Sequence, residues 1–401
     1  MAAMWLFWLA ARLRHWVGLV ATVFTAITAT GPSAGPTLSP NALANHLARL
    51  ASLTREVVDS YIDRSGPGDP RYWQNGSFVA VGPESCWYCY DTAATAAAVL
   101  SREDGGDARM RNIAVETFDH AIRTYQQPDG AFTDGIATGF FAVELGVSYL
   151  ELRSYLDPDT RATWVASIRR AANYLLLSGD MTYYIKGNVD LRQTEVMWLA
   201  WAVTHQQRFL NAYNSSWTFT VTPPQQRWPG FGLQITAVPT LPDASDGAGY
   251  LAESGGGTPG FDPSYTMVQL DTATELYVLT RDPRYLRLMN LLFNQERPRI
   301  GGDDVLNATG GTRENDMTPF MSAGPAVLVL SADRPNLTGF WLAQLGTIHV
   351  QYRAAMKYSE INFYKGTSGW LSVPVLAIEW PHGMLGAPCV PRQSVVCAQL
   401  F

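Results

Sequence analysis

The sequence predicts a mainly α-helical protein, an (α/α) toroid or incomplete helical barrel built of antiparallel helix hairpins. Apolar residues recur at helical spacing along most of the chain. Turn signals rich in Gly, Pro, Asn and Asp interrupt this pattern at intervals of roughly 20 to 25 residues, which fits helix pairs stacked around one core. A long irregular insertion and a short β-like segment near the C-terminus complete the predicted architecture.

The first residues are typical of an export signal, with 1–34 as the segment removed. Arg12 and Arg14 precede the apolar run 16–27, and small residues follow it. A membrane-spanning helix needs about 20 apolar residues, so cleavage is favoured, with an uncleaved anchor as the alternative. We therefore expect a secreted or cell-surface protein without stable membrane insertion after cleavage, in which residues 41–401 form one toroid domain.

Predicted helices define the first half of the chain. A helix at 43–62 leads into a loop rich in Gly, Pro and aromatic residues, 65–89, whose Trp87 and Tyr88 are candidate sugar-stacking residues. Asp91 is placed to cap the Ala-rich helix that follows. Further helices are expected at 109–126, 136–155, 158–177 and 190–205.

The second half begins with the irregular insertion, at 218–260, which is rich in Pro and Gly. Long insertions of this kind are usually functional. Helices are expected to resume at 265–280, 283–294, 319–330 and 337–351. The tail 358–380 has the residue pattern of short strands.

Four cysteines form two local pairs, Cys86 with Cys89 and Cys389 with Cys397. An even number in an exported chain favours two short-range disulfides. A zinc site is the weaker alternative, because the second pair lacks the short spacing that such sites use.

The first candidate site is a Gly-containing loop that carries Asp129 and Asp134 just before a predicted helix. Carboxylates can face a ligand there beside the backbone donors of the helix start. A capped turn, with Asp134 serving the next helix, is the favoured alternative.

The second candidate site gathers Tyr184, Lys186 and Asn188 before a helix that carries Arg192 and Glu195. This Asn-containing loop resembles the helical-toroid polysaccharide lyases and glycoside hydrolases, in which an Asn or an acid near a helix start faces the sugar. The resemblance implies a secreted carbohydrate-active enzyme. The alternative is that Asn188 only caps the helix.

The third candidate site comprises Tyr250, Asp262 and Tyr265, next to flexible glycines. Aromatic rings stack on sugar faces while acids bind hydroxyl groups. In the lyases this region resembles the segment with the catalytic Tyr, which implies Tyr265 first and Tyr250 second. The chain departs from those families in one respect, since it has no histidine between His205 and His349.

The fourth candidate site is a polar segment, 310–316, in which Arg313 and Asp316 would bind substrate. A structural Arg–carboxylate pair is the alternative. All four segments precede predicted helices, so they could gather on one rim of the toroid.

Three functions compete. A glycoside hydrolase would use two carboxylates drawn from Asp134, Glu195 and Asp262, with inversion expected by analogy. A lyase would use Asn188 to neutralise a uronate carboxylate and Tyr265 to move the proton, with cations nearby to lower the tyrosine pKa. A non-catalytic carbohydrate-binding protein is the third. Surplus carboxylates, negative charge and the missing histidine favour the hydrolase.

The formal net charge is −6, and losing Arg12 and Arg14 would change it to −8. Such acidity disfavours nucleic acid or anionic membrane as partner and leaves a polysaccharide or oligosaccharide as the expected substrate. The chain has no nucleotide-binding, dinucleotide-binding or serine-hydrolase motif, and its histidines lack metal-ligand spacing. We therefore expect no cofactor and no metal.

Overall fold

The computed structural model describes much of the chain from residue 91 onward. The described residues are 91–102, 107–255, 258–302, 304–313, 317–320, 322–331, 333–344, 372–377, 379–385, the hairpin 72–74 and 77–79, and scattered positions between 45 and 59. Those scattered positions are all helical, as expected for the first helix. Outside the described residues lie the predicted leader, the four cysteines, Trp87, Tyr88 and Asp316.

Long helices occupy most of the described chain. They are α2 (Asp91–Leu100), α3 (Ala108–Tyr125), α4 (Gly135–Leu152), α5 (Pro158–Leu177), α6 (Gly187–Thr204), α7 (Gln207–Val221), α8 (Pro263–Thr280), α9 (Pro283–Glu296) and α10 (Gly324–Leu330). Residues 338–344 and 372–377 are also helical. Short 3-10 turns lie at η4 (Asp180–Thr182), η5 (Arg297–Arg299) and η6 (Pro335–Leu337).

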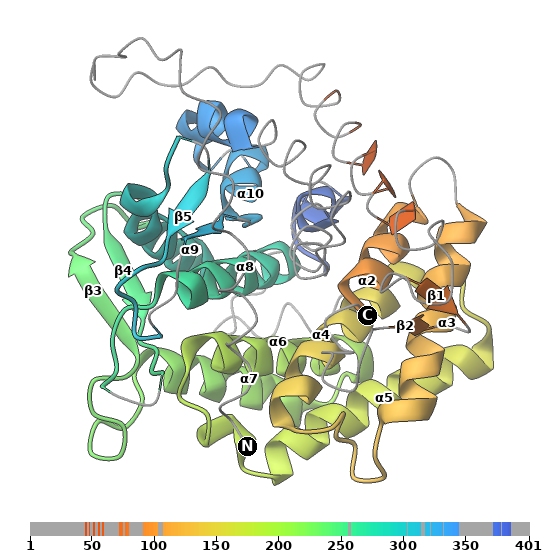
Figure 1. Cartoon of the computed structure of the whole chain (residues 1–401). Helices are drawn as coiled ribbons and strands as arrows, with labels where there is room; N and C mark the ends of the chain where they lie inside the picture. Colours follow the sequence, from red (N-terminus) through yellow and green to blue (C-terminus); the bar gives the residue numbers. More distant parts are fainter. Residues whose placement is uncertain are drawn as a thin grey trace.

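The helices alternate between an inner and an outer layer. Each of α2, α4, α6 and α8 packs against the next helix in the chain, its hairpin partner, and also against the next even-numbered helix. In Figure 1, α6 accordingly lies between α7 and α8, with α4 beside it. The predicted toroid of helix hairpins is therefore confirmed.

The two layers differ in sequence for a physical reason. The inner helices α4 and α6 are buried along nearly their whole length, so they bury residues on every side. The outer helix α3, by contrast, buries one face only, as its amphipathic sequence requires. Asp107, Asp157 and Asp282 cap the starts of α3, α5 and α9 with their side chains.

Helix α4 is long and apolar enough to cross a membrane by length and composition. However, 89% of this helix is buried inside the protein. It is therefore accounted for as a core helix of the toroid, which is surrounded by its neighbours α2, α5 and α6.

Three short hairpins interrupt the helices. They pair β1 (Tyr72–Gln74) with β2 (Ser77–Val79), β3 (Leu233–Ala237) with β4 (Ala248–Leu251), and β5 (Val305–Asn307) with β6 (Met317–Pro319), all antiparallel. The sequence pattern did not predict helix α7, which extends to Val221. The irregular insertion predicted at 218–260 therefore starts after α7, and it contains β3 and β4. Helix α10 begins five residues later than predicted, at Gly324 rather than 319, because β6 uses the residues before it.

The predicted strands in the tail are wrong where the structure describes them. Residues 372–377 form a buried helical segment rather than a strand. Its valines suggest a strand by local propensity, but burial on all sides inside the toroid favours a helix, whose backbone bonds are all internal. The rest of 358–380 lies outside the described residues.

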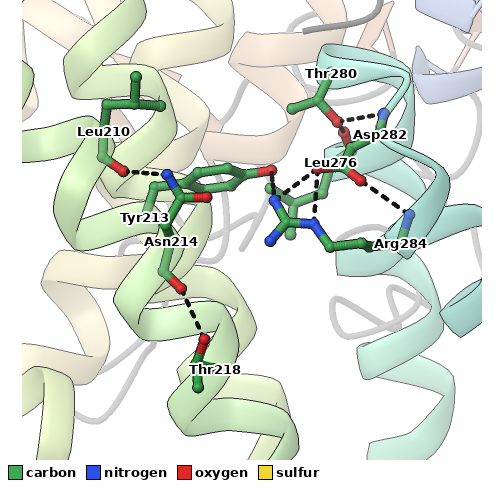
Figure 2. A network of polar contacts seen from close by, with 8 residues as sticks. All are labelled: Leu210, Tyr213, Asn214, Thr218, Leu276, Thr280, Asp282 and Arg284. Carbon is green, nitrogen blue, oxygen red and sulfur yellow. Dashed lines mark hydrogen bonds and ion pairs between the residues drawn. The ribbon is translucent and has the colours of Figure 1, made fainter. Parts of the chain in front are cut away.

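Polar contacts also join the outer helices α7 and α9 (Figure 2). The Arg284 guanidinium bonds the Asp282 carboxylate at 2.6 and 2.8 Å and lies 5.5 Å from the centre of the Tyr213 ring. Asp282 is 1% exposed and accepts the backbone N–H of Arg284 at 2.9 Å. The α9 cap is therefore part of the contact between neighbouring hairpins.

Candidate active site

The centre of the candidate site is Glu253, which follows β4 and is fully buried. Its Oε1 accepts the backbone N–H of Asn188 at 3.2 Å and the Nε2 of Gln269 at 3.0 Å. Its Oε2 has no hydrogen-bond partner within the described part of the chain. Glu253 therefore brings together the start of α6, the end of β4 and helix α8.

The close approach of α6 to β4 depends on Gly187. A Cβ at this position would collide with the Leu251 side chain and lie 3.0 Å from the Gln269 Nε2. Because strand side chains alternate, Leu251 and Glu253 point to the same side, toward α6. A glycine at the helix start thus lets the carboxylate reach the Asn188 amide.

Asp190 lies on the first turn of α6 and is 3% exposed. Its Oδ1 lacks a hydrogen-bond partner among the described residues. Burial, and next the charge of Glu253, raise the pKa of Asp190 well above its usual range. Burial also raises the pKa of Glu253 to about 7, although its two donors and Arg313 oppose this. The charge of Glu253 therefore acts on Asp190, so the two buried carboxyl groups are neighbours at the start of α6.

A second wall of the site is made by Asp262, Tyr265 and Arg313. Asp262 is fully buried and caps α8, accepting the Tyr265 N–H at 3.0 Å, while its other oxygen accepts the Arg313 N–H at 2.9 Å. The Arg313 guanidinium lies 3.9 Å from the centre of the Tyr265 ring. Burial nevertheless raises the pKa of Tyr265, with Arg313 opposing it only in part. Asp262 thus has a structural role in joining α8 to the 310–313 loop.

Lys186 is the residue just before α6 and is half-buried. Burial first, and then the charge of Arg313, lower the pKa of its amine, while Glu253 raises it. Among the described residues neither Lys186 nor Arg313 has a carboxylate within ion-pair distance. Two cations therefore lie beside the carboxyl pair.

Arg192 and Glu195 lie deeper, in the interior of the toroid. The Arg192 guanidinium forms ion pairs with Glu195, at 3.0 Å, and with Glu275 of α8. Burial raises the pKa of Glu195 well above its usual range and that of neighbouring Glu144 to about 7. Glu144 and Glu275 also line a cavity between α2, α4, α8 and residues 372–380. This cluster holds the inner helices together and does not meet Glu253.

The first predicted site is a capped turn. Asp134 is exposed and accepts the Ala137 N–H at 2.7 Å, and Asp129 is exposed and accepts the Ala131 N–H at 3.0 Å. Burial first, and then the charges of Asp180 and Asp134, raise the pKa of Tyr184 to about 12. This loop therefore lies next to Tyr184, at the edge of the site rather than at its centre.

Tyr250 occupies the opposite side of β4 from Glu253, because they are three positions apart in the sequence and strand side chains alternate. Its ring packs 5.1 Å from that of Phe261. The structure thus brings together Lys186, Asn188, Tyr265 and Arg313, but not Tyr250, around the carboxyl pair.

Sequence reasoning missed the two carboxylates at the centre. Asp190 is the first residue of the helix predicted at 190–205, and Glu253 lies inside the predicted insertion 218–260, and neither stands out in the sequence. A signal for Glu253 exists, since alternation from the apolar Leu251 places it on the buried side of a strand. Within the described part of the chain no cluster of His, Cys, Asp and Glu could hold a metal ion.

Comparison with known proteins gives a likeness of fold. No protein-family profile and no curated protein sequence matches the chain. Among solved structures, the β-1,3-1,4-glucanase of Paenibacillus sp. X4 aligns with a TM-score of 0.52 at 10% identity, over 87% of this chain and 96% of that one.

The unsaturated glucuronyl hydrolase of Streptococcus agalactiae aligns with a TM-score of 0.47 at 11% identity, over 86% of this chain and 94% of that one. A double mutant of it gives 0.49 at 11% identity, over 86% and 93%. Identities this low establish the toroid fold alone, and only the glucanase alignment is close enough to support an argument about it.

Proposed function

We propose that this chain is a glycoside hydrolase that cleaves a polysaccharide or oligosaccharide with Asp190 and Glu253 as its catalytic pair. The observation that carries the proposal is the pairing of two buried carboxyl groups at the start of inner helix α6, each with one oxygen that has no hydrogen-bond partner among the described residues. Glycoside hydrolysis requires one protonated and one ionised carboxyl group on either side of the bond.

The two environments assign the roles. Burial, and next the charge of Glu253, raise the pKa of Asp190 well above its usual range, which suits it to donate a proton to the leaving oxygen. Glu253, with a pKa of about 7, ionises near neutrality and acts as the base toward water. Asn188 and Gln269 hold the Glu253 carboxylate in place.

A lyase is the second candidate, and one observation favours it. Asn188, Tyr265, Lys186 and Arg313 meet at the same site, as elimination from a uronate would need. Against it, burial raises the pKa of Tyr265, whereas a general base needs a lowered one. The hydrolase therefore remains our first choice.

The two cationic side chains of this site also indicate the charge of the substrate. Lys186 and Arg313 face the carboxyl pair without an ion-pair partner in the described part of the chain, so a sugar with a negative group would neutralise them. We accordingly infer an acidic glycan. Export of the chain with two short-range disulfides also belongs to the proposal, on the strength of its leader and cysteine pattern.

The test is incubation of the protein, freed of its leader, with neutral and acidic polysaccharides, reading reducing ends and the absorbance of unsaturated products together. Reducing ends alone support hydrolysis, and both signals support elimination. Neither signal, with saturable glycan binding, supports the non-catalytic alternative.

Substitution of the pair makes the test specific. Asp190→Asn and Glu253→Gln should each lower kcat by about 10² to 10⁴, because each removes an acid or a base. The matched control is Asp134→Asn, which changes a carboxylate to an amide that still caps the helix. Wild-type activity in a folded Asp190→Asn or Glu253→Gln protein would exclude the pair.

A further inference from the structure

Gln269 of α8 is a buried side chain with three hydrogen bonds, all to the end of β4 and its extension. Its Oε1 accepts the Leu251 N–H at 3.3 Å, and its Nε2 donates to the Leu251 carbonyl oxygen at 3.0 Å. The same Nε2 donates to the Glu253 Oε1 at 3.0 Å. Gln269 is fully buried, so these bonds are shielded from water and hold the strand end against α8.

These contacts leave Glu253 with two different oxygens. Oε1 is held by Gln269 and by the Asn188 N–H, whereas Oε2 has no partner in the described residues. Two donors on one oxygen fix the plane of the carboxylate, so the position of Oε2 is fixed as well.

Charged groups surround this carboxylate from each neighbouring element. Lys186 and Asp190 face it from α6, and Arg313 and Asp262 face it from the 310–313 loop and the start of α8. None of them makes a hydrogen bond to Glu253 among the described residues, so orientation depends on the neutral groups.

We propose that Gln269 is a positioning residue that orients Glu253 so that its free oxygen points to the reacting group. This inference rests on the proposed catalytic role of Glu253. A purely structural role would need only the two hydrogen bonds to Leu251, which by themselves hold the end of β4 against α8. The third hydrogen bond, to Glu253, is not needed for that contact.

Two variants remove the bond to Glu253 and differ in how much of the strand clamp they keep. Gln269→Met keeps the approximate volume but removes every hydrogen bond, whereas the ionised form of Gln269→Glu keeps an acceptor for the Leu251 N–H and loses both donations, to Glu253 and to the Leu251 carbonyl oxygen. Gln193 of α6 provides the control, since it is fully buried and both its polar side-chain atoms lack partners in the described structure. Gln193→Met should therefore leave the kinetics unchanged.

The expected result is a fall in kcat of about tenfold to a hundredfold in both Gln269 variants, with KM changed by less than about threefold. The acid limb of the pH–rate profile should move to higher pH, because loss of a donor to the carboxylate, and the added charge in Gln269→Glu, disfavour its ionised form. A folded Gln269→Met protein with the kcat and pH profile of the unsubstituted protein would overturn the proposal.

A spectroscopic measurement tests the contact without activity and without a Gln269 variant. The side-chain amide resonance of Gln269 should titrate with Glu253 in the unsubstituted protein and lose that titration in Glu253→Gln. A Gln269 amide that does not respond overturns the inference even if glycans are cleaved. Conversely, a response without cleavage of any glycan refutes the proposed function while leaving the contact established.

Discussion

At the scale of single residues, burial decides what each carboxyl group can do. Asp134 and Asp262 both cap helices, yet only Asp262 is buried in the site. Asp190 and Glu253 differ from these caps because each has a buried oxygen without a hydrogen-bond partner in the part of the chain that the structure describes. Burial without full hydrogen bonding raises a carboxyl pKa, and such groups mark candidate acids and bases.

The pH dependence of activity follows from this pair. kcat/KM should rise as Glu253 ionises, with a midpoint near its pKa of about 7, and fall at higher pH as Asp190 loses its proton. A pH–rate series on the free enzyme measures both limbs, and Glu253→Gln should abolish the acid limb. An acid limb near the ordinary carboxyl pKa of about 4 would contradict these roles.

At the scale of elements, the site depends on close packing of helix starts against strands. The sequence located most helices to within a few residues, since caps and apolar spacing are local signals. Besides helix α7, it missed two elements, the β3–β4 hairpin and the helical segment 372–377. Pairing of distant residues and burial inside the toroid decide those two, and neither is visible locally.

Gly187 is the element-scale test of that packing. Gly187→Ala should lower the unfolding free energy by about 1 to 3 kcal/mol and reduce activity, because the new Cβ would push α6 away from Leu251. Gly339→Ala is the control, since no atom lies within 4 Å of its added Cβ and it stands exposed in a helix. That change should stabilise the protein by about 0.5 to 1 kcal/mol in urea unfolding.

The buried cap between outer helices gives a second prediction. Asp282→Ala should lower the unfolding free energy by about 2 kcal/mol, because it removes the α9 cap and leaves Arg284 without its carboxylate (Figure 2). Removal of the exposed α5 cap in Asp157→Ala should cost less. Equal losses in urea titrations would show that the α7–α9 contact adds nothing to capping.

At the scale of the whole molecule, several buried carboxyl groups inside the toroid keep their protons above the usual pH range. Burial, mainly, raises the pKa of Glu144 and of Asp271 to about 7 and that of Glu151 to about 8. Arg192 pairs with Glu195 and Glu275 and offsets only part of this acidity. Inner helices that are buried on every side therefore hold acids that ionise above their usual pH range.

The unfolding free energy should therefore depend on pH through these carboxyl groups. Between about pH 5 and 8 the folded chain keeps protons that the unfolded chain has already released, so the unfolding free energy should fall as pH rises, by about 1.4 kcal/mol per pH unit for each proton retained. Glu144→Gln should make this slope shallower, because the amide needs no proton. Urea unfolding at several pH values measures it, and a slope that Glu144→Gln leaves unchanged would remove Glu144 from this account.

The sequence by itself determined the helical toroid and the segments around Asn188, Tyr265 and Arg313 that meet at the site. Helical spacing, caps and turn residues act within a few residues of one another, so they can be read along the chain. Only the tertiary structure decided that Glu253 and Asp190 form the central pair and that Arg192 belongs to the interior. Burial and the charge of distant neighbours set those roles, and both arise when separate segments pack together.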